Sequence, residues 1–254
     1  MKEFLVQASN YTFYVTKEKD GPNVSVLKFW KFLLNDLRVQ RLSLPPCVEV
    51  HAYSRYPIAT LANVEYGAKC GRYGLQRELE PGLDTRMMVE IAMDTTLTMF
   101  PHVTSFHLSD FSAKWCPPLR SKIRLDTLGL LTKGTSWYER SFGARLERAS
   151  VAEQWTRLKI LFGQGVDVTS EEFHQVVNAL HYRSSVEERL QLDAVLENTR
   201  DLTWHNMFSR LLQLGCQVFT DHVVQTLNQI FQIPNGELWT ICRTRSHQVF
   251  IERI

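Results

Sequence analysis

Length, composition and charge narrow the class of protein first. The chain has 254 residues, of which 44% are hydrophobic and 22% are charged, a balance typical of a folded protein with one large or two ordinary domains. The formal net charge is +2 and no long basic run occurs, which argues against nucleic acid or an anionic membrane as a partner. No stretch approaches the roughly 18 apolar residues of a membrane span, and the N-terminus lacks the apolar run of a signal peptide.

The cysteines indicate a reducing compartment. They are five in number, widely spaced and without a C-x-x-C pair, so neither a disulfide framework nor a zinc site is predicted: Cys47, Cys70, Cys116, Cys216 and Cys242. We therefore expect reduced thiols in the cytoplasm or nucleus. Cys116 could act as a nucleophile with His107 or His102, but a structural thiol is the simpler interpretation.

The beginning of the chain predicts strands and one helix. Alternating apolar residues over 3–16 predict two short strands, ended by a turn at 20–23. Within 25–38 the apolar residues recur at helical spacing, so an amphipathic helix is predicted there. The segments 47–53 and 57–66 then predict successive strands of a β-meander.

The middle of the chain combines helices with strands. Asp84 is a good N-cap for a helix over 85–99, and 103–110 predicts a strand. A helix near 122–132 leads to the segment Gly129 to Leu146, GLLTKGTSWYERSFGARL. Here we predict a short helix capped by Thr135 or Ser136, ended by Gly143 and followed by a strand. The element order predicts an α+β or mixed α/β fold with a central sheet flanked by helices.

Beyond residue 150 the pattern becomes mostly helical. Thr169 with Glu172, and Ser184 with Glu187, have capping-box spacing. The final segment, 237–254, is rich in β-forming residues on both sides of Arg245-Ser246 and predicts a β-hairpin. We therefore divide the chain into a domain at 1–150 and a helical region at 151–254 with a terminal hairpin. This helical region is the natural place for a protein partner.

Two resemblances involve the segment around Trp137. Trp137 to Ala144, WYERSFGA, resembles the end of the last core helix in the GNAT-like N-acetyltransferase fold, which commonly reads Tyr-Glu-Lys-x-Gly-Phe. Asp110 to Leu146, with its Trp-Tyr-Glu and Phe-Gly-Ala pieces, is similar to proteins of unassigned function encoded by large DNA viruses of eukaryotes. These resemblances imply a GNAT-like central sheet, and a location in the host cytoplasm or nucleus or in the virion.

The GNAT-like resemblance also implies acetyl-coenzyme A as the cofactor. In that family, a turn of the form Gln/Arg-x-x-Gly-x-Gly/Ala lets the N–H groups of a helix N-terminus bind the pyrophosphate. Gly82 matches this pattern, whereas Leu79 and Asp84 depart from it, and a carboxylate at that place would repel a phosphate. Arg77 and Arg86 could supply compensating positive charge.

Tyr138 matches the family tyrosine that protonates the departing thiolate, although a buried core aromatic is the alternative interpretation. His174 and His181 share a helical face without a cysteine or carboxylate partner, so no metal site is predicted. Two functions stay open. One is an N-acyltransferase, and the other is a non-catalytic protein of the same fold that acts through protein contacts, for example in a virion or scaffold.

Overall fold

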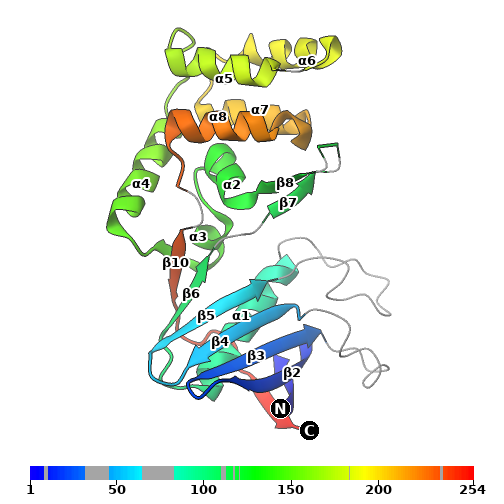
Figure 1. Ribbon diagram of the computed structural model, residues 1–254, viewed down its shortest axis with the longest axis vertical. Coiled ribbons are helices and arrows are strands. Elements are labelled where there is room, and N and C mark those ends of the chain that lie inside the picture. Colours follow the sequence, from blue (N-terminus) through cyan, green and yellow to red (C-terminus); the bar gives the residue numbers. More distant parts are fainter. Residues whose placement is uncertain are drawn as a thin grey trace. The chain divides into compact units, whose positions relative to one another are not determined.

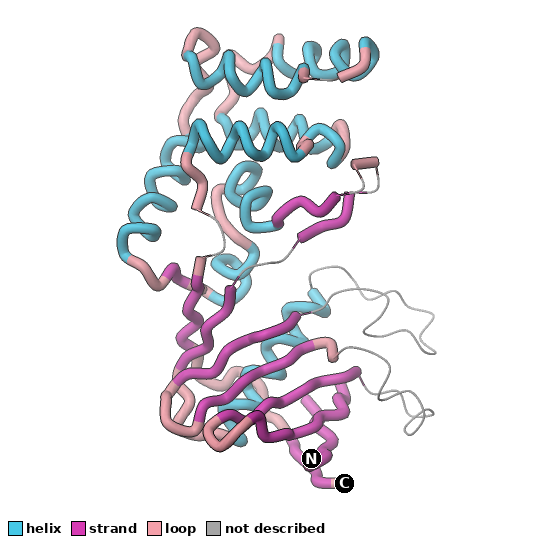
Figure 2. The backbone as a smooth tube through the Cα atoms, viewed as in Figure 1, coloured by secondary structure: helices cyan, strands magenta, loops and turns pink. Residues whose placement is uncertain are grey.

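The computed structural model describes residues 1–8, 11–31, 46–64, 83–109, 113–116, 118–119, 121–182, 184–234 and 237–254. Within these ranges the fold is mixed α+β, with a nine-stranded, mostly antiparallel sheet and eight α-helices (Figures 1 and 2). The chain forms two compact units, 1–109 with 239–254, and 110–238. The predicted boundary at residue 150 falls inside the second unit.

The sheet has the strand order β11-β1-β2-β3-β4-β5-β6-β10-β9. From β11 to β5 neighbouring strands are antiparallel, whereas β5 and β6 are parallel and are connected through α1 (Leu83–Met99). The strands associated with the first unit are β1 (Lys2–Ala8), β2 (Tyr11–Asp20), β3 (Val24–Lys31), β4 (Val48–Tyr53), β5 (Ile58–Val64), β6 (Ser105–Ser109), β10 (Leu238–Cys242) and β11 (Phe250–Arg253).

Most predictions for the first unit are confirmed. The two N-terminal strands, the meander of β4 and β5, and the strand β6 all form. The turn between β2 and β3 contains Gly21 at φ 73°, a left-handed conformation that favours glycine. The predicted face of α1 is buried at Met88, Ile91 and Ala92, and α1 lies against one face of the sheet in Figure 1.

The helix predicted over 25–38 is wrong for its first part, because β3 covers Val24–Lys31. This segment pairs with β2 on one side and β4 on the other. Val26 and Leu27 are consecutive and both buried, so both faces of the strand are covered. β3 is apolar at five of its eight positions, and apolar residues on both faces of a strand can imitate helical spacing. The rest of the predicted helix lies outside the described residues.

The predicted C-terminal hairpin is also wrong. β10 lies beside β6, whereas β11 pairs with β1, where Phe4 is opposite Arg253. The N-terminus and C-terminus consequently lie close together in Figure 1, with the Ile254 N–H donating to the Glu3 carbonyl at 3.2 Å. The segment between these strands is fastened to α1 instead of turning back on β10.

An ion-pair cluster fastens that segment. Asp94 on α1 is fully buried and accepts from Arg243 Nε and Nη2 at 3.1 and 3.2 Å and from the His247 N–H at 2.9 Å. One turn earlier, Glu90 lies 2.9 Å from both His247 Nε2 and Arg86 Nε. Arg243 therefore neutralises a buried carboxylate.

The second unit is mainly helical. Its helices are α2 (Leu125–Lys133), α3 (Trp137–Phe142), α4 (Ala149–Gly163), α5 (Glu171–His181), α6 (Val186–Leu196), α7 (Trp204–Gln213), the 3-10 helix η1 (Cys216–Val218) and α8 (Asp221–Phe231). β7 (Ala113–Cys116) and β8 (Ser121–Arg124) pair as an antiparallel ribbon, and β9 (Arg145–Leu146) follows α3. The core contains edge-to-face aromatic pairs, among them Phe162 with Phe208 and with Phe231.

The helix caps lie one residue beyond the predicted positions. α5 is capped by Ser170, which accepts from the Phe173 N–H at 3.2 Å, while Thr169 instead donates to Asp167. α6 is capped by Ser185, which forms a reciprocal capping box with Glu188. Adjacent hydroxyl residues can each act as a cap, and the path of the chain into the helix selects between them.

A disulfide overturns the expectation of reduced thiols. Cys116 at the end of β7 is bonded to Cys216 in η1, with 5.9 Å between their Cα atoms. Cys116 therefore has no thiol to serve as the nucleophile that the sequence allows. Cys47 is also disulfide-bonded, whereas Cys242 is free and exposed. A separation of 100 residues between the paired cysteines leaves no local spacing pattern in the sequence.

Candidate functional site

The parallel strands β5 and β6 part partway along their length. Residues 58–60 pair with residues 105–107, and the register ends there. On its other edge β5 has a β-bulge, because Leu61 pairs with Val50 and Asn63 with Glu49, which leaves Ala62 as an extra residue. A bulge bends its strand and increases the local twist. β5 therefore diverges from β6, and the distance between the two strands grows toward their carboxyl ends (Figure 1).

This opening lies in the kind of strand-helix-strand unit that binds ligands. In such units ligands bind outside the carboxyl ends of the strands, and a helix N-terminus provides free N–H groups for a phosphate. The helix α1 begins at Leu83, immediately after the predicted pyrophosphate residue Gly82. Asp84 is the second residue of α1, so the helix begins before the residue predicted to be its N-cap.

The predicted site residues are distributed over both units. Gly82 and Arg77 lie outside the described residues. Arg86 is in the first unit, and its guanidinium is half exposed and 2.9 Å from Glu90. Tyr138 is in the second unit and is 6% exposed. None of the described members of this set lines either pocket that the structure describes.

The Glu90 carboxylate is largely buried and contacts basic side chains. Burial by itself raises the pKa of this carboxyl group, but hydrogen bonds from His247 and Arg86 and the nearby charge of Arg243 outweigh burial. The net result is a pKa below the ordinary value, so Glu90 is ionised at neutral pH. Arg86 therefore already has an anionic partner in this structure.

The helix α3 forms as predicted, and Glu139 is its central residue. Ser136 is the N-cap, and it forms a reciprocal capping box with Glu139. The Glu139 carboxylate also accepts from Trp155 Nε1 at 3.1 Å and from Lys159 Nζ at 2.9 Å, both on α4. Burial raises the pKa of Glu139, but these hydrogen bonds, with that from Lys159 first, lower it overall. The glutamate of the Trp-Tyr-Glu piece thus connects α3 to α4.

The aromatic residues of α3 pack against one another. Trp137 stands edge-to-face to both Tyr138 and Phe142, with ring centroids 4.9 and 5.2 Å apart. The helix ends at Gly143, whose φ of 63° is the left-handed cap predicted from the sequence. Packing and capping account for these residue types without requiring a ligand. The catalytic role of Tyr138 stays a prediction.

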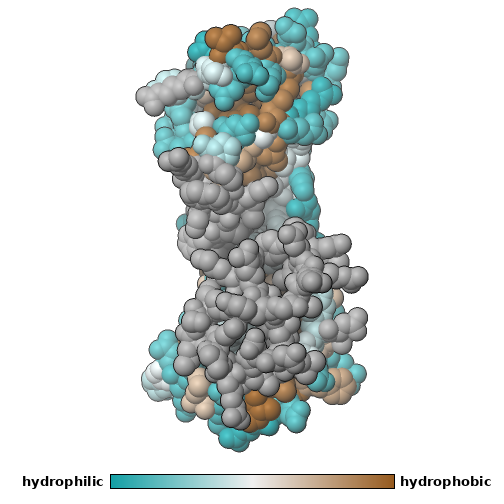
Figure 3. Space-filling view, turned by 90° about the vertical axis from the view of Figure 1, so that its right-hand side faces the viewer, coloured by the Kyte–Doolittle hydropathy of each residue, from teal (hydrophilic) through white to brown (hydrophobic). Residues whose placement is uncertain are grey.

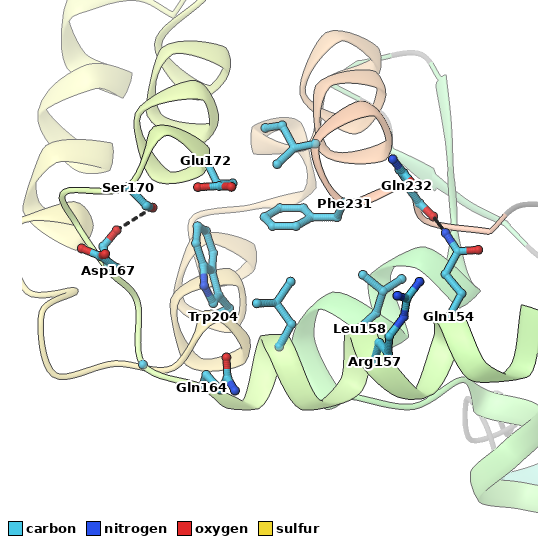
Figure 4. A pocket seen from close by; sticks show the side chains of 13 residues that line it. Gln154, Arg157, Leu158, Gln164, Asp167, Ser170, Glu172, Trp204, Phe231 and Gln232 are labelled. Carbon is cyan, nitrogen blue, oxygen red and sulfur yellow. Dashed lines mark hydrogen bonds between the residues drawn. The ribbon is translucent and has the colours of Figure 1, made fainter.

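A groove in the second unit is a second candidate site (Figure 4). It has a volume of about 500 Å³, within the range of small-molecule and peptide pockets. Its walls come from α4, the loop before α5, and the adjoining ends of α5, α7 and α8. The lining residues are Gln154, Arg157, Leu158, Leu161, Gln164, Gly165, Asp167, Ser170, Glu172, Trp204, Ile230, Phe231 and Gln232.

Residues around this groove are held in defined positions. Gln154 donates through its amide to the Gln232 carbonyl, and Gln232 has a φ of 51°, which is uncommon for a residue other than glycine. Asp167 accepts from the hydroxyl and N–H groups of Thr169, and these hydrogen bonds lower its pKa. No sequence motif marks this groove, because its walls come from segments that are far apart in the chain.

Comparisons with family models, curated proteins and solved structures find no match to this chain. Among the described residues, no helix is long and apolar enough to cross a membrane. The part of the chain covered by the structure also contains no group of three or more metal-ligating side chains, and His181 lies 3.0 Å from Asp193. The candidate sites therefore depend on their own geometry.

Proposed function

We propose that the protein has a GNAT-like fold and binds acetyl-coenzyme A as an N-acyltransferase. One observation carries the proposal: β5 and β6 separate at the bulge of Ala62, and the chain between these two strands forms the helix α1. The expected Gly82 turn directly precedes the first residue of α1, the position that a pyrophosphate-binding turn requires. The sheet supplies the strand-helix-strand frame, and the resemblance at Trp137 to Ala144 supports the same family.

In this proposal each predicted residue has a distinct role. Gly82 allows the backbone to approach the pyrophosphate, while Arg77 and Arg86 add positive charge. Arg86 would divide its charge between Glu90 and the ligand. Bound acetyl-coenzyme A would supply the acyl group as a thioester, and the family resemblance assigns to Tyr138 the proton that passes to the departing thiolate.

A thermal shift measurement tests cofactor binding. Acetyl-coenzyme A at about 100 times its dissociation constant should add about 2.7 kcal/mol to the free energy of unfolding, a rise of several degrees in the midpoint. We expect Gly82→Trp to abolish this shift. Gly163→Trp is the matched control, because a Cβ atom added at Gly163 has open space around it. An unchanged midpoint for the wild type at millimolar ligand would refute the acyltransferase proposal.

A second function, protein binding without catalysis, is favoured by the surface of the helical region 151–254. The groove provides a concave site there, and large apolar residues are exposed nearby in the sequence at Tyr182, Val186 and Leu190. Figure 3 shows hydrophobic side chains among hydrophilic ones on this part of the molecule. Exposed apolar surface of this kind is typical of interaction sites.

The disulfide bond is also evidence for the compartment in which this second function would operate. The sequence favours the host cytoplasm or nucleus, or the virion. The Cys116–Cys216 bond supports the virion among these, because disulfides persist on virion surfaces and are rare in the cytosol and nucleus. A virion or scaffold component with a partner on its helical region is consistent with this bond.

A further inference from the structure

We propose that the groove between α4, α5, α7 and α8 binds a peptide segment of a partner protein, in which a large apolar side chain adjoins a lysine or arginine. This inference rests on the second function above and names the partner's chemistry. It is independent of acetyl-coenzyme A, since every residue of the groove belongs to the second unit.

The floor of the groove suits one large apolar side chain. Leu158, Trp204 and Phe231 form it, and each is at least nine-tenths buried, so their positions are fixed by the core. Leu161 on α4 adds an apolar side chain that is 36% exposed at the wall. A rigid apolar floor with a more exposed wall favours an anchoring side chain inserted from solvent.

The rim of the groove suits a peptide main chain. Gln154, Gln164 and Gln232 line it, and each side-chain amide can both donate and accept hydrogen bonds. A peptide backbone presents the same alternation of donor and acceptor. Phosphate-bearing ligands usually meet several basic groups, but Arg157 is the sole lysine or arginine among the residues that line this groove.

The charged side chains at the groove indicate where a basic residue of the peptide would bind. Asp167 and Glu172 contribute carboxylates on the α5 side, whereas Arg157 contributes a guanidinium from α4, and Figure 4 shows Glu172 and Arg157 on different sides of the groove. Within the described part of the chain, the side chains of Glu172 and Arg157 make no hydrogen bond or ion pair. A basic residue of the partner would therefore lie at the Glu172 side, next to the apolar anchor.

A displayed peptide library tests this inference. Random 12-residue peptides on phage would be selected on the intact protein, and the most enriched peptide would be measured by fluorescence anisotropy. We expect enriched peptides to share a large apolar residue beside lysine or arginine. Glu172→Lys should weaken binding about two- to fivefold, the effect of losing a partly exposed ion pair. Glu171→Lys is the control, because Glu171 does not line the groove and instead accepts from Gln175.

A second pair of variants tests the apolar contact. Leu161→Glu should weaken binding about tenfold or more through lost apolar contact, whereas Ile160→Glu, at a neighbouring residue that is 60% exposed and outside the groove, should not. Unchanged thermal midpoints would establish that these variants fold. The inference is overturned by no shared motif, by an acidic motif, or by equal weakening within either pair. If acetyl-coenzyme A does not raise the thermal midpoint of the wild type, the first function is refuted, but the outcome of the peptide experiments is unaffected.

Discussion

At the scale of single residues, the Asp94 carboxylate is held by several contacts within the first unit. It is fully buried, and Arg243 is held against it by two hydrogen bonds. The net contribution of such a pair to stability is small, because removing both charges from water costs nearly as much as their attraction returns. Removing one partner is different, since the other is then left charged and buried.

We therefore expect Asp94→Asn to lower the free energy of unfolding by about 3–5 kcal/mol. Arg86→Ala, which removes a half-exposed guanidinium from the same cluster, should cost less than about 1 kcal/mol. Urea denaturation of both variants measures the difference. Similar losses in the two variants would show that the buried pair does not anchor the C-terminal segment.

A pH dependence follows from Glu139. The pKa of Glu139 is lowered in the folded protein, so the folded state favours the ionised carboxylate, and this stabilisation is fully present above the unfolded pKa of about 4.5. It is lost as the pH falls through the lower folded pKa. Glu139→Gln should thus be less stable than the wild type at pH 7, and the difference should shrink in acid. A difference that stays constant between pH 7 and acid would contradict the assigned ionisation.

At the scale of elements, the disulfide connects β7 to η1 within the second unit. It closes a loop of 100 residues, and chain entropy predicts that loops near this length contribute up to about 4–5 kcal/mol by restricting the unfolded state. This effect acts on the unfolded chain, so neither local helix nor strand patterns reveal it. The bond also fixes the ribbon of β7 and β8 to a segment that the sequence places far away.

Cys216→Ser should therefore lower the thermal midpoint, and Cys242→Ser, at the free exposed cysteine, should not. Mass spectrometry of the unreduced protein should show that Cys116 and Cys216 resist alkylation until a reductant is added. Complete alkylation of both cysteines without reductant would show that they are free thiols and would support the reducing compartment predicted from the sequence.

At the scale of the whole molecule, much of the element order could be predicted. The first two strands, the meander, α1, α3 and the helices after residue 150 were indicated by local periodicity and caps. The separation of β5 from β6 could not be predicted, because a bulge is defined by how one strand pairs with its neighbour and not by the sequence of one strand. The groove likewise requires α4, α5, α7 and α8 to meet, and none of its residue types is unusual alone.

The sequence by itself determined the features whose causes lie within a few residues. Ser136 begins α3 and Gly143 ends it because a hydroxyl can satisfy free N–H groups and glycine can adopt a positive φ. Tertiary structure decided the strand identity of Val24–Lys31, the separate positions of β10 and β11, and the pairing of Cys116 with Cys216. Those outcomes depend on which distant segments bury apolar surface and pair charges together, and short-range propensity is too weak to oppose them.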